Sequence, residues 1–137
     1  MEYRNLGNSG LKVSVLGLGA NNFGWWIDEQ RSTAVINHAL ELGINFIDTA
    51  DWYDNGRSEE YIGSTLKGRR KEVFIATKFS QPMGENPNDR GGSRWYIKRA
   101  VEASLNGLIP TILTYTRCII LTQRHPLKKR CALLTIL

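Results

Sequence analysis

Apolar, strand-like segments alternate with amphipathic helical segments through residues 1–108, and this alternation restricts the possible folds more than any other feature. The predicted strands are residues 13–19, 44–48 and 72–78, and the predicted helices are residues 28–43, 58–68 and 93–107. Strands that are joined by helices favour a parallel sheet with right-handed crossover connections. The sequence therefore predicts an α/β fold.

Turn and cap residues place the ends of these elements. Gly7–Gly10 separates two short extended runs, which predicts a β-hairpin at the N-terminus. Ser58 and Ser93 stand at predicted helix N-caps, and Gly43 stands at a predicted helix C-cap. A Pro-, Gly- and Asn-rich stretch, residues 79–92, predicts a long loop. The apolar face predicted for the first helix contains Ala34, Val35, His38, Ala39 and Leu42, with His38 in a structural role.

Three polar residues stand at or just after the ends of predicted strands. Asp48 ends one strand, Tyr53 follows it in the next turn, and Lys78 ends the following strand at the matching position. A lysine at the end of a buried strand needs a partner, and Asp48 on the neighbouring strand is the expected one. A lysine beside Tyr53 would make the phenol a better proton donor. Taken singly, Asp48 could equally be a helix cap and Tyr53 a half-buried aromatic residue.

Together these residues resemble the aldo-keto reductase family, in the branch of general bacterial reductases and potassium-channel β subunits. The resemblance rests on YRNLGNSGLKVSVLGLG, FIDTADWYDNGRSEEYIG and VFIATK, and it extends over residues 1–108. It implies the N-terminal portion of a (β/α)8 TIM barrel, preceded by a β-hairpin. It also implies NADPH-dependent reduction of aldehydes or ketones to alcohols, with a small carbonyl compound as the substrate.

The resemblance assigns roles to individual residues. Asp48 would be the lysine partner, Tyr53 the proton donor and Lys78 the activating cation. Gly19, Asp48 and Lys78 would contact the cofactor, and Trp25, Trp26 and Trp52 would line the substrate entrance unless they serve only packing. The stretch GLGANNFG begins like a dinucleotide-binding GxGxxG motif, but Asn22 occupies the third glycine position. No metal site is expected.

The fourth catalytic residue of the family, a histidine in a motif like QxHxPD, has no counterpart in residues 109–137. His125 lies in QRHPL, outside any strand-end pattern, and is not assigned that role. Codons for this tail can be chosen so that a shifted frame spells PDYIDLYQVHYPDPETPIEETLRAFDDL, which matches the family. The tail is therefore interpreted as an out-of-frame reading that begins near Ile109; a genuine divergent tail or a splice variant is the alternative.

The composition of the tail agrees with that interpretation. Residues 109–137 hold five of the 18 basic residues, both cysteines and no acid, so they account for the whole net charge of +5. Nucleic-acid and membrane partners are therefore not expected, although a basic tail that binds polyanions is an alternative. The first ten residues do not resemble a signal peptide, no apolar run is long enough to span a membrane, and residues 1–108 lack cysteine. A cytoplasmic location is expected.

The sequence is compatible with three functions. The motifs favour a reductase, but a barrel of this family needs eight strands and about 250 residues. The 137-residue chain is therefore expected to be inactive. A non-catalytic fragment or pseudogene product and an interaction protein like the channel β subunits are the alternatives. The outer edge of the last predicted strand, residues 72–78, is expected to stay unpaired.

Overall fold

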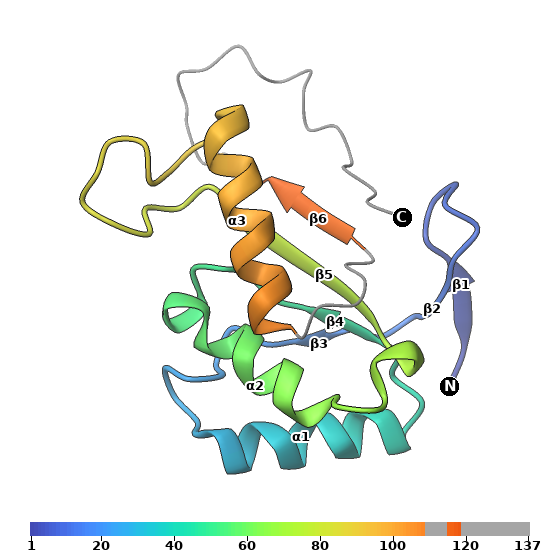
Figure 1. Ribbon diagram of the computed structural model, residues 1–137. Helices are drawn as coiled ribbons and strands as arrows, with labels where there is room; N and C mark the ends of the chain where they lie inside the picture. Colours follow the sequence, from blue (N-terminus) through green and yellow to red (C-terminus); the bar gives the residue numbers. More distant parts are fainter. Residues whose placement is uncertain (109–114, 119–137) are drawn as a thin grey trace.

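The computed structural model describes residues 1–108 and the short strand 115–118 (Figure 1). Its strands and helices, with two 3₁₀ turns, follow in this order: β1 (Tyr3–Asn5), β2 (Lys12–Ser14), β3 (Leu18–Gly19), α1 (Glu29–Glu41), β4 (Phe46–Asp48), η1 (Tyr53–Gly56), α2 (Arg57–Thr65), η2 (Arg70–Glu72), β5 (Phe74–Phe79), α3 (Arg94–Gly107) and β6 (Tyr115–Cys118).

The sheet is parallel and its strands lie in sequence order, β3-β4-β5-β6. Right-handed crossovers between strands in this order place every connecting helix on the same face, and Figure 1 shows α1, α2 and α3 there. The opposite face corresponds to the inside of a barrel. The predicted incomplete α/β barrel portion with an N-terminal hairpin is thus confirmed for the described residues.

The core lies between the sheet and its helices. Ile47 of β4 and Ile75 of β5 are 1% and 0% exposed, and Ile36, Ile62 and Val101 of the three helices pack in the same cluster. Side chains alternate between the two faces of a strand. Since Ile47 and Ile75 point toward the helices, Asp48 and Lys78 point to the opposite, barrel-interior face.

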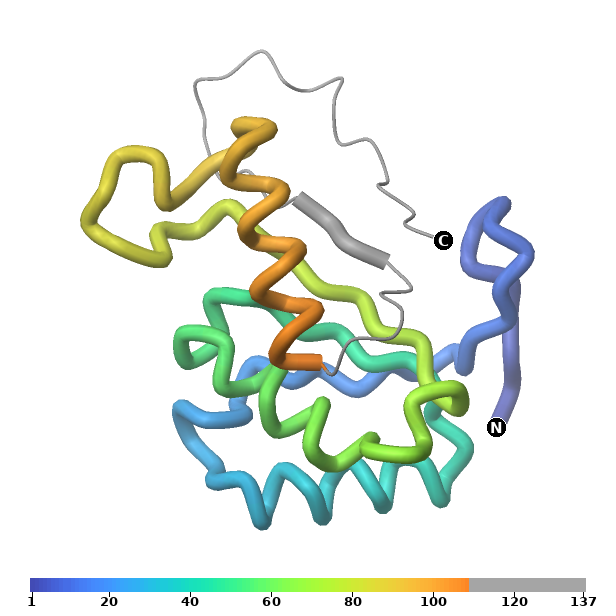
Figure 2. Tube along the Cα trace, in the orientation of Figure 1, coloured from blue at the N-terminus to red at the C-terminus, as the bar shows by residue number. Residues whose placement is uncertain are grey.

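The hairpin lies away from the C-terminal ends of the strands (Figure 2). Its strands β1 and β2 are antiparallel. The Tyr3 hydroxyl donates to the Gly43 carbonyl, and the Ser14 backbone N–H donates to Oδ1 of Asn45, the residue before β4 begins. These contacts fix the hairpin at the N-terminal ends of the strands, so the opposite end is free for a functional site.

Three local predictions were wrong. The segment 13–19 is divided between β2 and β3, because the Ser14 hydroxyl donates to the Leu16 carbonyl and turns the chain between them. Ser58 lies inside α2, whose N-cap is Gly56 with φ 91°. The buried residues of α1 are Ser32, Ile36 and Ala39, so of the predicted face only Ala39 is buried. His38, which was predicted to belong to that face, is exposed.

The outer edge of β5 is also paired, contrary to expectation. β6 aligns Tyr115 with Ala76 and Cys118 with Phe79 in a parallel register. Four residues of the tail therefore form a strand where the sequence analysis expected an unpaired edge. The remaining tail residues, among them His125 and Cys131, lie outside the described residues, and the out-of-frame interpretation is not tested by the fold.

Candidate active site

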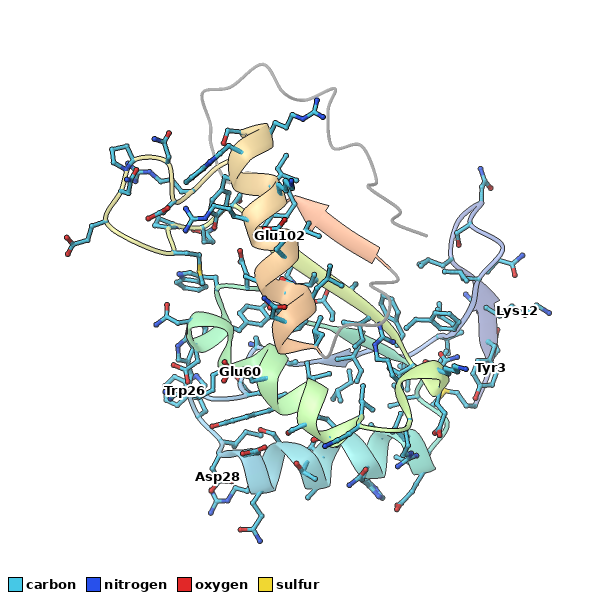
Figure 3. The ribbon with its side chains drawn as sticks, in the orientation of Figure 1. Tyr3, Lys12, Trp26, Asp28, Glu60 and Glu102 are labelled. Atoms are coloured by element: carbon cyan, nitrogen blue, oxygen red, sulfur yellow. The ribbon has the colours of Figure 1, made fainter. Side chains whose placement is uncertain are left out.

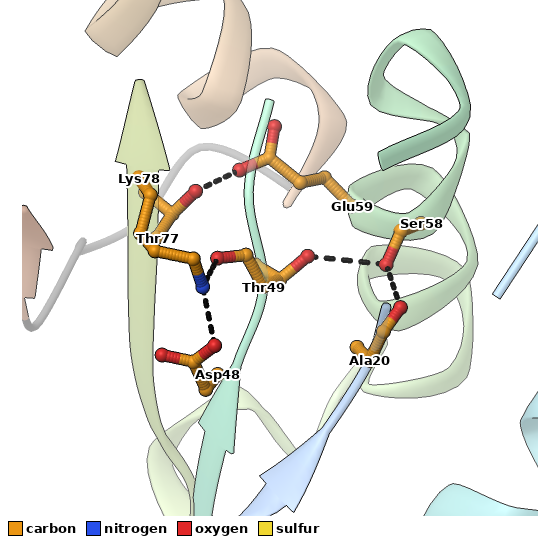
Figure 4. Close-up of polar contacts among 7 residues, drawn as sticks. All are labelled: Ala20, Asp48, Thr49, Ser58, Glu59, Thr77 and Lys78. Carbon is orange, nitrogen blue, oxygen red and sulfur yellow. Dashed lines mark hydrogen bonds and ion pairs between the residues drawn. The ribbon is translucent and has the colours of Figure 1, made fainter. Parts of the chain in front are cut away.

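Asp48 and Lys78 meet at the C-terminal ends of two adjacent strands. The parallel register aligns Asp48 with Ala76, and Lys78 lies two positions further along β5 on the same face. The Lys78 ammonium forms an ion pair with Asp48 Oδ1 and donates a second hydrogen bond to the Thr49 carbonyl (Figure 4). The lysine side chain is only 10% exposed, whereas that of Asp48 is 48% exposed. The ammonium is therefore held firmly while the carboxylate keeps an open side.

Tyr53 joins this pair from the turn that follows β4. The Lys78 ammonium lies 5.0 Å from the centroid of the Tyr53 ring, a cation–π separation. The backbone N–H of Asp51 donates to the Lys78 carbonyl over 3.0 Å, which ties this turn to the end of β5. The structure thus brings together all three residues that the sequence placed at strand ends.

The turn keeps its shape through an uncommon backbone conformation. Asp54 and Asn55 have φ values of 48° and 53°, in the left-handed region that Asp and Asn tolerate better than most residues. The Asp54 carboxylate pairs with Arg57 at 3.0 Å and lies against Gly24, where a Cβ would come within 2.5 Å of Asp54 Oδ2. A larger residue at position 24 would therefore displace the turn that carries Tyr53.

Gly19 leaves room for a ligand beside Asp48. The two residues are aligned in the β3–β4 register, and a Cβ on Gly19 would meet only Asn21 Oδ1, at 3.9 Å. An exposed glycine backbone beside a half-exposed carboxylate suits a ligand that carries hydroxyl and amide groups, such as the nicotinamide riboside end of a nicotinamide cofactor. The residues present fit that end of the cofactor.

Aromatic side chains stand next to Tyr53. Trp25 contacts Trp52 edge to face at 4.8 Å between ring centroids, and its ring lies 5.9 Å from that of Tyr53. Trp26 is 78% exposed, and Trp25 and Trp52 are 41% and 42% exposed. Trp25 and Trp52, two of the three tryptophans that the sequence placed near the site, therefore form an aromatic wall at the strand ends, whereas Trp26 faces solvent.

Behind the strands, on the helix side, lies a polar network that sequence reasoning missed. Ser58 donates to the Ala20 carbonyl at 3.0 Å and shares a hydrogen bond with the Thr49 hydroxyl at 3.1 Å (Figure 4). The Thr77 hydroxyl donates to Glu59 Oε1 at 2.6 Å. These bonds tie α2 to β5 and to the residues that directly follow β3 and β4, so they fix the strand ends that present Asp48 and Lys78.

Two carboxyl groups in this region are buried. Burial raises the pKa of Glu59 to about 7, and the charge of Asp51 adds to the rise, while hydrogen bonds from Thr77 and Ser104 oppose it. Burial also raises the pKa of Asp51 to about 6, against hydrogen bonds from the Trp52 N–H and the Tyr96 hydroxyl. The sequence did not distinguish Glu59 from an ordinary acidic residue in the first turn of a helix, although it lies three positions before Ile62 on the buried side of α2.

Residues 1–108 contain no group of three or more His, Cys, Asp and Glu side chains placed to hold a metal ion. No helix within the described part of the chain is long and apolar enough to cross a membrane.

Comparison with known proteins places these features in a family. The profile of the aldo/keto reductase family matches residues 15–109. The chain is 39% identical over 115 residues to the uncharacterized oxidoreductase YqkF of Bacillus subtilis, covering 79% of this chain. It is 41% identical over 112 residues to a protein of Arabidopsis thaliana named "Probable voltage-gated potassium channel subunit beta", again covering 79% of this chain.

A solved structure agrees with these sequence matches. The holo form of aldo-keto reductase AKR11C1 from Bacillus halodurans superposes with a TM-score of 0.75 and 38% identity. The match covers 86% of this chain and 40% of that one. The chain spans 35% and 34% of the length of the two sequence relatives, so it corresponds to about a third of each.

Proposed function

Because this chain belongs to the aldo/keto reductase family, we propose that Asp48, Tyr53 and Lys78 are three members of a site that reduces aldehydes or ketones to alcohols. The observation that carries the proposal is the convergence of a buried ammonium, its carboxylate partner and a phenol at adjacent strand ends. The proposed substrate is a small carbonyl compound.

Each residue has a distinct task in the proposed reaction. Tyr53 donates its hydroxyl proton to the carbonyl oxygen as negative charge develops there. Lys78 stabilises the phenolate that remains, because its ammonium is fixed beside the ring. Asp48 holds the ammonium in place through the ion pair. Trp25 and Trp52 shield the carbonyl group from water and pack against the rest of the substrate.

The proposed cofactor is NADPH, held at its nicotinamide end by Gly19, Asp48 and Lys78. When bound, it would supply the hydride that the protein's own side chains cannot provide. The open backbone at Gly19 and the free side of the Asp48 carboxylate support this placement.

We further propose that a polypeptide of these 137 residues does not catalyse this reduction. Hydride transfer requires the donor and the carbonyl carbon to be held about 3–3.5 Å apart in a reactive orientation. The described part of the chain supplies four parallel strands, whereas the family barrel uses eight. Residues 1–108 are proposed to be the part of the chain that derives from the family barrel. The histidine that the family places on a further strand is expected to be encoded only after the reading frame near residue 109 is restored.

The experiment compares two proteins. One is the 137-residue chain, and the other is expressed from the same gene with one base restored near codon 109. NADPH oxidation with a small aromatic aldehyde is followed by absorbance. We expect turnover only in the restored protein, and we expect Tyr53→Phe to abolish it while NADPH binding persists. A restored, folded protein without NADPH-dependent turnover would refute the proposed reaction. Turnover by the 137-residue chain would refute only its proposed inactivity.

A further inference from the structure

Exposed apolar side chains gather where the end of α1 meets the N-terminal hairpin. The described residues include ten large apolar side chains that are exposed. Four of them are the three tryptophans near the candidate active site and Trp95 on α3. The remaining six are 41–60% exposed: Met1, Tyr3, Val15, Leu16, Val35 and Leu42. We call these six residues the α1–hairpin patch, and an exposed apolar group of this size indicates an interaction surface.

Contacts between the hairpin and α1 hold the α1–hairpin patch together. The Tyr3 hydroxyl donates to the Gly43 carbonyl, just after α1, at 2.9 Å. A Cβ on Gly43 would lie 3.1 Å from Cβ of Met1, so the first residue also lies beside the end of α1. The Val15 N–H donates to the Glu2 carbonyl at 3.0 Å, which brings the segment before β3 to the same place. Figure 2 shows the N-terminus next to this end of the helix.

The flank of α1 that carries Val35 and Leu42 faces away from α2. Two helical turns separate these two side chains, so they lie one above the other. α2 packs on the other flank, where Thr33 shares a hydrogen bond with Thr65 at 2.9 Å. In a closed barrel every strand and helix has a neighbour on both sides. The described part of the chain supplies no strand on the free side of β3, so the flank of α1 beside that edge stays exposed.

The charged side chains around the α1–hairpin patch are mixed in sign. Arg4 pairs with Glu2 at 2.9 Å, and the His38 ring lies 3.3 Å from the Glu41 carboxylate. Lys12 of β2 is exposed and adds one positive charge. Such a surface does not select a strongly charged partner, and it does not strongly repel an identical surface. Its apolar residues and its mixed charges therefore suit a second copy of this chain.

We propose that the α1–hairpin patch joins two copies of this chain about a two-fold axis. In this dimer the two α1 helices run antiparallel, so Val35 of each copy meets Leu42 of the other. Six side chains, each about half exposed, offer on the order of 500 Å² per copy. The dimer then buries about 1,000 Å², the lower limit for a specific interface. The dissociation constant is therefore expected in the micromolar range.

The test is sedimentation equilibrium of the 137-residue chain over protein concentrations that span the micromolar range. The mass should rise with concentration from 15.5 kDa toward twice that value and stop there. Added salt should favour the dimer, because it screens the repulsion between two chains that each carry a net charge of +5. A monomer at every concentration, or a mass that keeps growing past the dimer, would overturn the proposal.

Three variants locate the contact, with circular dichroism to check that each one folds. Leu42→Lys brings two like charges into the interface and should raise the dissociation constant roughly tenfold or more. Val35→Lys, also at an exposed position, should do the same and keeps the test decisive if Leu42→Lys does not fold. Trp26→Lys is the matched control, because Trp26 is 78% exposed but lies on the opposite side of the molecule from Tyr3 (Figure 3). Unchanged association in the folded patch variants, or an equal loss in Trp26→Lys, would refute the assignment.

Discussion

Replacing Glu59 by Gln should change how the stability of the chain depends on pH. The pKa of Glu59 is raised from 4.5 to about 7 in the folded protein. Between these two values the folded state binds a proton that the unfolded state releases, so the free energy of unfolding falls as the pH rises. The loss begins near pH 4.5 and is complete above about pH 7. A shift of this size corresponds to a free energy on the order of 3 kcal/mol.

Gln cannot ionise, and its amide oxygen can still accept the hydrogen bond from Thr77. Glu59→Gln should therefore become more stable than the parent as the pH rises from 4.5 to about 7, because only the parent loses unfolding free energy in this range. The difference in unfolding free energy should then level off above about pH 7, at up to roughly 3 kcal/mol. Asp51 also titrates in this range, but it is present in both proteins, so most of its contribution cancels in the difference.

The assay is urea-induced unfolding followed by circular dichroism at several pH values, from about 4 to about 8. Glu60→Gln is the control, because it removes the same charge from the next residue at an exposed position. Its difference from the parent should stay within about 0.5 kcal/mol at every pH. Parallel stability curves for Glu59→Gln and the parent would show that burial does not penalise this carboxylate, and the reasoning would be wrong.

Gly63→Ala should lower the free energy of unfolding by about 2–4 kcal/mol, because its Cβ would come within 2.2 Å of the Gly107 carbonyl oxygen and force α2 and α3 apart; a midpoint of urea unfolding equal to that of the parent would contradict this contact. Asp48→Asn should lower the free energy of unfolding by about 1–3 kcal/mol, because the buried Lys78 ammonium loses its charged partner. The same urea titration measures the loss, and an unchanged midpoint would show that the pair adds nothing to stability. Sequencing the gene should show that one base restored near codon 109 joins VEASLNGL to PDYIDLYQVHYPD and continues into further barrel strands; downstream DNA that encodes no such strands in any frame would end the frameshift proposal.

The sequence alone was enough to identify the parallel α/β pattern, the hairpin and the three residues at the strand ends. Asp48 and Lys78 were predictable because side-chain alternation and parallel register act over a few residues. The Ser93 cap was equally local, and its side chain accepts a hydrogen bond from the Tyr96 backbone N–H as predicted. These features depend on the order of residues within one or two elements.

Tertiary structure decided the features that depend on distant partners. The apolar pattern of α1 favoured Val35 and Leu42, but the helix buries Ser32 and Ile36, and Thr33 shares a hydrogen bond with Thr65 of α2. Small polar residues such as Ser32 and Thr33 allow α1 to lie close to α2, and the spacing of apolar side chains along α1 does not reveal this contact.

The burial of charged side chains also depends on distant partners. Glu59 looks like an ordinary acidic residue in the first turn of a helix, and only the approach of β5 and α3 buries it. The pairing of β6 with β5 likewise depends on a free strand edge that a later segment of the chain can reach. Such pairing does not depend on the reading frame that encodes the segment. Local sequence determined most of the elements, whereas burial, strand pairing and some element ends depend on which distant surfaces the fold brings into contact.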